Sequence, residues 1–233
     1  MKFKIKKYKA SCFAANKLLI SKNLSIQTFG NVSQRINEKL FVIKPSGINL
    51  NISKSDDMVV VDILKGKIVN SKFKPSSDTE THRILYKHYP EIKGIAHAHP
   101  TYLTAWAQAG KNIPVLGTTH ADYWKNEIPI TQALKKNDIK KNYEFNTGLS
   151  IIRTIEKKKI KLNECPGALS KYHGAFAWGS SCEEAVKHIE LMEFIARLAL
   201  YTTVLGRKGK KISRYQIFKH FFRKHGSKKY YGQ

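Results

Sequence analysis

The sequence has no long hydrophobic run. Its strongly apolar stretches, such as residues 58–64, are far shorter than the roughly 20 residues that a membrane-spanning helix needs. The first ten residues are rich in lysine and lack the apolar segment of a secretory signal peptide. We therefore expect a cytoplasmic protein with no membrane partner.

Cysteine is scarce, and its spacing shows no pairing pattern. The three cysteines, Cys12, Cys165 and Cys182, are odd in number, widely separated and form no CxxC motif. Such a pattern argues against a disulfide framework. We expect reduced, mostly buried thiols in a reducing compartment.

Acidic residues and arginine are both rare. The chain has 17 acidic residues against 42 basic ones, a formal net charge of +25, and only seven of the basic residues are arginine. A nucleic-acid or anionic-membrane surface is one interpretation of this charge. However, nucleic-acid readers favour arginine for its bidentate fork, and the lysines here are scattered along the chain. We therefore expect a lysine-rich composition and no nucleic-acid partner, with a positive field that still helps to capture an anionic substrate.

No internal repeat, low-complexity tract, Pro/Gly-rich linker or GxGxxG loop interrupts the chain. Its 233 residues are 42% hydrophobic, which suits one domain over residues 1–233. Hydrophobic periodicity predicts helices over residues 8–24, 76–90, 101–110 and 181–206, and strands within 39–47, 56–69, 92–99 and 167–179. Pro45, Gly47 and a turn at Lys65–Gly66 break the first two of these strand segments. The expected fold class is α/β in the α+β sense, with a central, mostly antiparallel or mixed sheet covered by helices.

Two of the predicted helices have capping signals at their start. Ser77 and Glu80 have the spacing of a capping box, and Pro90 ends the same segment. Ser181 precedes the apolar stripe of the last predicted helix.

Two histidines in "GIAHAHPTYLTAWAQAG", His97 and His99, form the most visible candidate site. A chain with nine histidines has about 0.3 such HxH pairs by chance, so the pair alone is a weak motif. On a strand, however, both side chains point to one face. His173 in "YHGAFAWG" is a third candidate. Three histidine ligands with an open position are typical of a catalytic zinc or related divalent metal site.

Three short stretches have the chemistry of phosphate-binding loops: "FGNVS" at 29–33, "KPSG" at 44–47 and "PSSD" at 75–78. Glycine allows close backbone approach to an anion, while Ser and Asn donate hydrogen bonds. Ser76 and Ser77 also precede a predicted helix, whose start favours phosphate. Each stretch could equally be an ordinary turn or helix cap.

Taken together, these segments resemble a known family. "GNVS", "KPSG", "SSDTETH", "HAH", "AWAQAG", "LGTTHADYW", "NTG", "HGAFAWG" and "HGSKKYYGQ" are similar, in order and spacing, to the L-ribulose-5-phosphate 4-epimerases of the class II aldolase family. The similarity extends from about Leu18 to Gln233 and rests on nine collinear segments. "HAH" stands where these epimerases usually have "HTH", and "HGAF" replaces "HGPF".

The resemblance implies roles for individual residues. The metal ligands would be His97, His99 and His173, with Asp78 as an additional carboxylate in or near the ligand set. The substrate phosphate and adjacent hydroxyls would be bound by Gly30, Asn31, Ser46, Gly47, Ser76 and Ser77. The two acid/base groups would be Asp122 and Tyr231, and Lys44, His220 and Arg223 would be further substrate contacts. From its residues alone, the segment around Tyr231 would be interpreted as an exposed tail.

The resemblance also implies an activity, a metal and an assembly. The expected reaction interconverts L-ribulose 5-phosphate and D-xylulose 5-phosphate with one Zn²⁺ per subunit, or another divalent ion such as Mn²⁺ or Co²⁺. The expected assembly is a homotetramer with active sites between subunits. The nearest rival is a sugar-phosphate aldolase acting on fuculose or rhamnulose phosphate, and a more distant rival is a basic nucleic-acid-binding protein.

Overall fold

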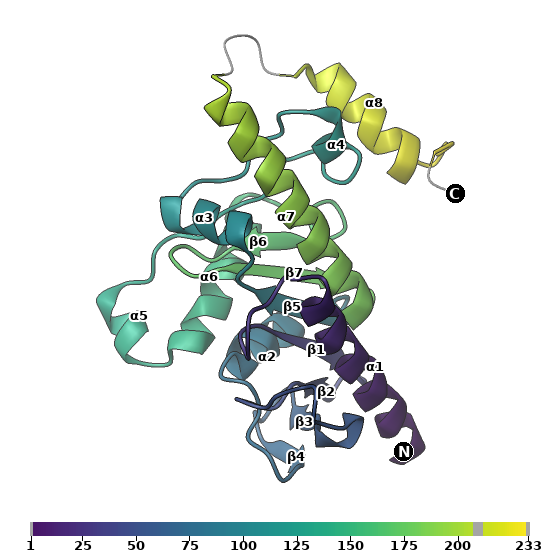
Figure 1. The fold of residues 1–233 in the computed structure, drawn as a ribbon, viewed down its shortest axis with the longest axis vertical. Coiled ribbons are helices and arrows are strands. Elements are labelled where there is room, and N and C mark those ends of the chain that lie inside the picture. The colour runs from purple at the N-terminus through teal and green to yellow at the C-terminus, as the bar shows by residue number, and fades with distance from the viewer. Residues whose placement is uncertain (1, 207–211, 232–233) are drawn as a thin grey trace.

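A seven-stranded sheet lies at the centre of the computed structural model, which describes residues 2–206 and 212–231 (Figure 1). Its strand order is β4-β3-β2-β1-β5-β7-β6, and each neighbouring pair is antiparallel. The strands are β1 (Asn31–Arg35), β2 (Leu40–Ile43), β3 (Val59–Asp62), β4 (Ile68–Asn70), β5 (Gly94–Ala98), β6 (Gly167–Leu169) and β7 (Ala175–Gly179). The expected α+β architecture with an antiparallel sheet is confirmed.

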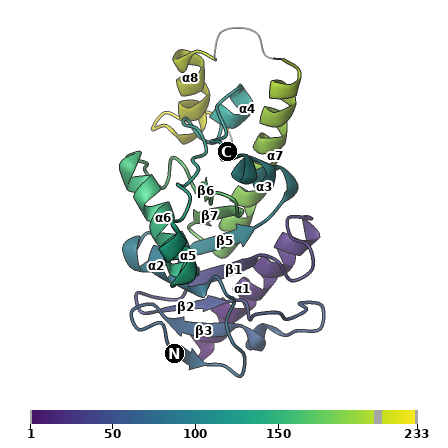
Figure 2. The ribbon, with the colours of Figure 1, turned by 90° about the vertical axis from the view of Figure 1, so that its left-hand side faces the viewer.

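Helices cover both faces of this sheet. α1, α3 and α7 pack on one face, whereas α2 and α6 pack together on the other (Figures 1 and 2). α4 packs against α8 beyond the edge of the sheet, beside the end of α7. The helices are α1 (Lys2–Ser21), the 3-10 helix η1 (Ser55–Asp57), α2 (Thr79–His88), α3 (Thr101–Ala109), α4 (Thr118–Ala121), α5 (Lys136–Lys140), α6 (Tyr143–Lys157), α7 (Cys182–Val204) and α8 (Arg214–His225).

The alternation of side chains along β5 divides the core between the two faces. Ala96 and Ala98 belong to the apolar cluster under α7, and their small side chains let this helix lie close to the sheet. Ile95 belongs to the cluster under α2 and α6. His97 is two residues further along, so its side chain lies on the same face as Ile95, where it stacks on Phe176.

The helix starts agree with the sequence in one case and differ in the other. Ser181 caps α7 by accepting a hydrogen bond from the Glu184 amide, as predicted. The capping box from Ser77 is wrong, because Asp78 is the N-cap residue of α2 and no side chain caps it. Glu80 instead pairs with Arg83, one turn along, at 2.7 Å.

Several segments differ from the sequence-based expectation, and two of them bear on the candidate site. The strand predicted over 167–179 is two strands, β6 and β7, joined by a turn that contains His173. Residues 31–35, expected in part as a phosphate-binding loop, form the central strand β1. Its polar residues look like a loop in sequence, yet they are buried, because distant segments supply their hydrogen-bond partners. Ser33 bonds His82 and Tyr86 of α2, and Gln34 accepts from the Cys182 amide.

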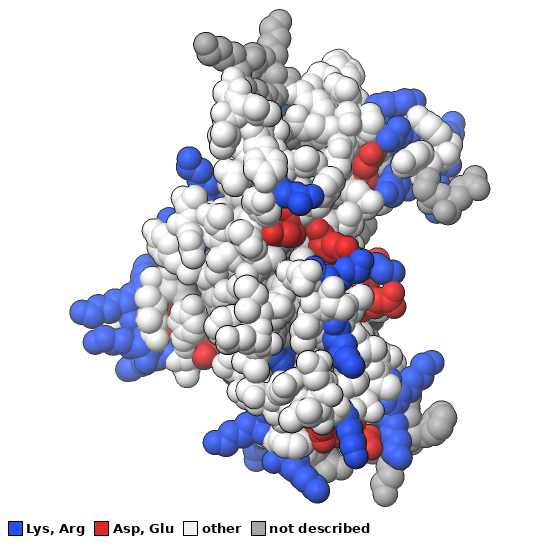
Figure 3. All heavy atoms as spheres, in the orientation of Figure 1, with Lys and Arg blue, Asp and Glu red and all other residues white. Residues whose placement is uncertain are grey.

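The buried cysteines and the distribution of basic side chains on the surface agree with what the composition predicts. Cys12, Cys165 and Cys182 are free and buried. On the face drawn in Figure 3, lysines and arginines lie in several separate groups rather than in one continuous patch. Within the described residues, no helix combines the length and apolarity needed to cross a bilayer.

Candidate metal centre and phosphate pocket

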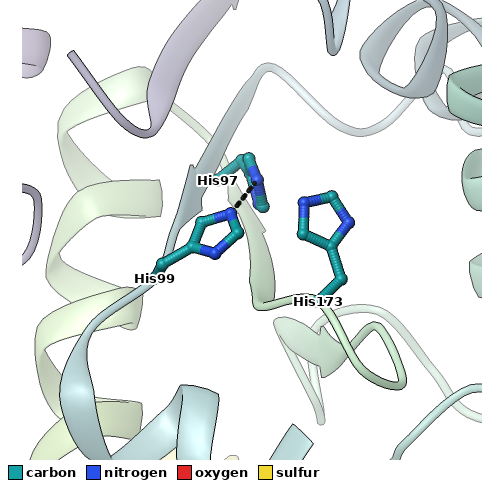
Figure 4. A group of neighbouring side chains, drawn as sticks. All are labelled: His97, His99 and His173. Carbon is teal, nitrogen blue, oxygen red and sulfur yellow. Dashed lines mark hydrogen bonds between the residues drawn. The ribbon is translucent and has the colours of Figure 1, made fainter. Parts of the chain in front are cut away.

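Three histidine side chains converge where β5 and β7 lie side by side. His97 belongs to β5, His99 follows the end of that strand, and His173 lies in the turn before β7. β5 and β7 are antiparallel with Ala98 opposite Ala175, so the end of one strand adjoins the start of the other. Figure 4 shows the three imidazoles around one common space, and one ligand atom from each lies within 4.8 Å of the others.

The geometry of this cluster suits a divalent metal. The Nε2 atoms of His97 and His99 are 3.0 Å apart. Two nitrogens bound tetrahedrally to one zinc ion at about 2.0–2.1 Å lie about 3.3 Å apart. The Nδ1–H of His97 donates to the Ala175 carbonyl at 2.9 Å, which leaves Nε2 unprotonated and directed at the cluster. The donor set therefore fits zinc or a similar ion.

Burial keeps these imidazoles neutral, as metal binding requires. Desolvation lowers the pKa of His97 to about 4, and it also lowers the pKa values of His99 and His173. Neutral imidazoles have a free lone pair at pH 7, so no proton competes with a metal ion there.

Asp78 adds a carboxylate beside the histidines. Its Oδ2 lies 3.9 Å from His97 Nε2 and accepts a hydrogen bond of 2.7 Å from the Asn31 amide. Burial alone would raise the pKa of Asp78, but the neighbouring histidines and the Asn31 hydrogen bond lower it below its usual value. The carboxylate is thus ionised and within reach of the same site.

A cavity of about 360 Å³ opens beside the cluster. Its lining contains all ten residues expected to bind metal or phosphate, namely Gly30, Asn31, Ser46, Gly47, Ser76, Ser77, Asp78, His97, His99 and His173. The structure therefore brings together segments that are up to 143 residues apart in sequence, between Gly30 and His173. The identification of these residues as ligands of a metal or a phosphate remains a prediction.

Backbone and lysine contacts hold the three polar loops together. The Ser46 amide donates to Lys74 O at 3.0 Å, and the Ser76 amide donates to Lys44 O at 2.9 Å. The Lys44 ammonium, buried to 4% exposure, donates to the carbonyls of Thr28 and Gly30. Burial lowers the pKa of Lys44, while Asp78 opposes that shift. This lysine thus joins the first two loops and adds positive charge to the pocket.

Glycine is required at the start of β1. Gly30 has a φ of +73°, and a Cβ atom at this position would lie 2.8 Å from the His97 carbonyl oxygen. Gly47 also has a positive φ, +64°, but no atom of the described residues lies within 4 Å of a Cβ placed there. The first glycine therefore allows backbone contact with the histidine strand, whereas the second leaves the pocket open.

The pocket also contains residues that the sequence did not indicate. Tyr143 and Glu144, at the start of α6, line it, and the Tyr143 hydroxyl lies 3.3 Å from His173 Nδ1. Burial raises the pKa of Tyr143, which favours its neutral form. No sequence signal marked these residues, because α6 itself was not predicted.

Asp122 and Tyr231 lie outside this pocket, in a second polar cluster at the contact between α4 and α8. The Asp122 carboxylate accepts hydrogen bonds from His220 Nδ1 at 3.0 Å and from Arg223 Nη2 at 2.9 Å. The Arg223 guanidinium stacks over the Tyr231 ring at 4.4 Å. Within one chain, these four residues therefore lie together and do not line the pocket of His97, His99 and His173.

Comparison with known proteins places the fold and the sequence in one family. A sequence model of the class II aldolase and adducin N-terminal domain matches residues 10–200. The chain is 45% identical over 230 residues to "L-ribulose-5-phosphate 4-epimerase UlaF" of Salmonella paratyphi B, covering 98% of this chain and 100% of that one. The protein of the same name from Salmonella typhi matches equally.

Solved structures agree at the level of the fold. An L-fuculose 1-phosphate aldolase superposes with a TM-score of 0.75 at 23% identity, covering 92% of this chain and 94% of the other. The L-fuculose-1-phosphate aldolase of Thermus thermophilus has a TM-score of 0.68 at 23% identity, with coverages of 88% and 100%. Given this fold and the match over residues 10–200, the chain belongs to the class II aldolase and adducin N-terminal domain family.

Proposed function

We propose that the chain is a metal-dependent L-ribulose-5-phosphate 4-epimerase, which interconverts L-ribulose 5-phosphate and D-xylulose 5-phosphate. The observation that carries this proposal is the 45% identity, over essentially the full length of both chains, to proteins named for that activity. The pocket supports it, because the histidine cluster and the three segments expected to bind phosphate line one cavity. We propose Zn²⁺ as the metal and the cytoplasm, where free thiols persist, as the location.

The chemistry of the substrate explains why both parts of the pocket are needed. The centre to be inverted, C4, is not adjacent to the C2 carbonyl, so simple enolisation cannot invert it. Cleavage of the C3–C4 bond can invert C4, if the released aldehyde rotates to present its opposite face before the bond forms again. A bound divalent ion supplies Lewis-acid stabilisation for the charge on the fragment that retains the carbonyl.

The polar loops keep the aldehyde fragment from leaving. Glycolaldehyde phosphate would be held by its phosphate at Ser46, Ser76 and the neighbouring backbone, while its aldehyde end rotates. Lys44 contributes positive charge beside that site. Retention of this fragment distinguishes an epimerase from an aldolase, which releases it.

The proton transfers require groups on both sides of C4, because the C4 oxygen lies on opposite sides in the two epimers. We propose Asp122 and Tyr231 for these roles. Because Asp122 and Tyr231 do not line the histidine pocket of their own chain, they would serve the pocket of a second copy. Such sharing is natural in a closed ring of subunits, and we propose a homotetramer.

Exposed apolar side chains support an interface at this end of the molecule. They occur on the second half of α7, in the segment after it and on α8, and include Leu198, Tyr201, Val204, Leu205, Tyr215, Phe218 and Phe222. Apolar residues gathered in this way are typical of a surface that another protein covers. The same end of the molecule contains Asp122 and Tyr231.

A product assay tests the proposed reaction. Zinc-loaded protein is mixed with L-ribulose 5-phosphate, and the sugar phosphates are followed by ¹³C NMR. We expect D-xylulose 5-phosphate to accumulate without free aldehyde. Stoichiometric free glycolaldehyde phosphate with no xylulose product would instead identify a sugar-phosphate aldolase, the activity named for the two structural neighbours.

A further inference from the structure

A second, larger hollow lies outside the metal pocket. Its volume is about 1110 Å³, and it is lined by the end of β1, the turn after it, the last turn of α2 and the segment before β5. Among the residues that the structure describes, none lines both this hollow and the metal pocket. The proposed reaction therefore makes no use of it.

Arg35 is a buried charged residue that lines the hollow, with 6% of its surface exposed. Its guanidinium donates to three backbone carbonyls: Nε to Ile92 at 2.8 Å, Nη2 to Tyr89 at 3.1 Å, and Nη2 also to Tyr86. Within residues 2–206 and 212–231, no carboxylate forms a salt bridge with it. Its hydrogen-bond partners are all neutral, and Glu38 and Glu91 compensate the buried charge only in part, through space.

One nitrogen of this guanidinium is available to a ligand. Among the described residues, Nη1 makes no hydrogen bond. It is not one of the fully buried polar atoms without a hydrogen-bond partner. It therefore retains accessible surface, which faces the hollow that Arg35 lines. The Tyr86 ring, 4.8 Å from the guanidinium carbon, holds the group in place. The donor is thus positioned before any ligand arrives.

The remaining charge around the hollow is also mostly positive. Lys39, Lys87 and Lys93 line it, whereas Glu38 is the carboxylate among its lining residues. These three lysines make no salt bridge within the described part of the chain. Each comes from a different element, namely the turn between β1 and β2, the last turn of α2 and the segment before β5.

We propose that this hollow binds a small anion bearing a phosphate group, at a site separate from the metal pocket. A phosphate dianion has several acceptor oxygens, so it can accept from Arg35 Nη1 and interact with more than one lysine at once. Asn37 and Ser180 line the same hollow and add neutral polar groups. Binding would compensate the buried guanidinium charge.

Isothermal titration of the zinc-loaded protein with inorganic phosphate tests this site. Because the metal pocket is itself proposed to hold phosphate, the titration uses a Ser76→Asp background, which places a negative charge in that pocket. We expect this background to retain one phosphate per chain. A parallel titration compares glycerol 3-phosphate with glycerol, which asks whether a phosphomonoester binds through its phosphate.

Charge reversal in the hollow identifies where that phosphate binds. Lys39 and Lys93 are exposed, so Lys39→Glu with Lys93→Glu should leave folding intact. In the Ser76→Asp background, this pair should weaken phosphate binding about tenfold or more, since each reversal removes an attraction and adds a repulsion. Lys111→Glu with Lys140→Glu, two exposed lysines outside both cavities, makes the same change in net charge and should have little effect.

Two results would overturn the proposal. One is the absence of phosphate binding in the Ser76→Asp background. The other is an equal loss of binding in the hollow pair and the control pair, which would show a general effect of net charge. Neither result bears on the epimerase assay, so the two proposals stand or fall separately.

Discussion

The Nδ2 amide of Asn31 donates a hydrogen bond of 2.7 Å to Oδ2 of Asp78, across the contact between β1 and the start of α2. The two residues are 47 positions apart, and Asn31 lies directly opposite His97 in the sheet. This amide therefore orients the carboxylate toward the histidine cluster. It is the first of several polar contacts between β1 and α2, and Ser33 continues them with hydrogen bonds to His82 and Tyr86.

We predict that Asn31→Leu weakens metal binding, because Asp78 loses the hydrogen bond that orients it and favours its ionised form. Loss of such an outer contact typically lowers metal affinity about 10- to 100-fold. Competition with a fluorescent zinc chelator measures the change. Asn51→Leu, at an exposed position outside the pocket, is the matched control. Equal zinc affinity in both variants would show that Asn31 has no part in holding Asp78.

Replacing His97 should abolish both metal binding and turnover. His97→Asn removes the buried imidazole whose Nε2 points at the cluster, and the shorter amide cannot reach the same position. Zinc content by elemental analysis and the rate of xylulose formation should fall together. His88→Asn is the control, because His88 is exposed and pairs with Glu156 away from the site. A fully active His97→Asn protein would contradict the metal assignment.

Acid should destabilise the metal-free protein through its buried histidines. Burial lowers the pKa of His97 to about 4, that of His120 to about 4 and that of His82 to about 3. The unfolded chain has the ordinary value near 6.5 and so binds more protons than the folded chain between these values. The free energy of unfolding therefore keeps its full value above about pH 6.5 and decreases as the pH falls toward 4.

Thermal unfolding of the chelator-treated protein at several pH values checks this dependence. The melting temperature should fall steadily between pH 6.5 and pH 4.5. Replacing buried His120 by Gln should reduce the slope, since one titrating group is removed. An unchanged melting temperature over this range would mean that these histidines are not held neutral by burial.

The two pocket glycines should respond differently to the same substitution. Both have a positive φ, which costs a non-glycine residue roughly 1–2 kcal/mol. Gly30→Ala also forces its Cβ against the His97 carbonyl, whereas Gly47→Ala meets open space. We expect Gly30→Ala to lower the free energy of unfolding more and to reduce zinc affinity, as measured by denaturant titration and chelator competition. Equal losses in both variants would mean that the close approach at Gly30 has no structural role.

Ten residues that the sequence indicated line one cavity, whereas strand β1 beside that cavity was not predicted. Glycine and serine at loop positions and paired histidines on a strand are local signals, and all ten residues line one cavity. β1 was missed because its alternating residues, Asn31, Ser33 and Arg35, are polar. Their hydrogen-bond partners lie in α2 and beside it, 47 to 57 residues away, and hydrophobic periodicity cannot detect such a strand.

Local sequence patterns could not predict the polar cluster around Asp122 either, and the reason is similar. Asp122 meets His220 and Arg223 through contacts that span about a hundred residues of sequence. Neither α4 nor α8 was predicted, so their packing could not be anticipated. Only the resemblance to a family indicated Asp122 and Tyr231, and their proposed action in a neighbouring subunit depends on an assembly.

The tail should be required for turnover and not for metal binding. Removing residues 231–233 deletes the Tyr231 ring that stacks on Arg223. Epimerase activity should fall severely, while the zinc content stays near one per chain, because Tyr231 does not line the histidine pocket. Full activity in the truncated protein would exclude Tyr231 from the reaction.

Subunit complementation tests the central claim most directly. Protein carrying His97→Asn and protein carrying Tyr231→Phe are each purified, unfolded, mixed in equal amounts and refolded with zinc. If the histidine pocket of one chain works with Asp122 and Tyr231 of another, mixed assemblies contain intact sites, and xylulose formation returns to a substantial fraction of the wild-type rate. Mixed assemblies that form and bind zinc but remain as inactive as the two parents would contradict a shared active site.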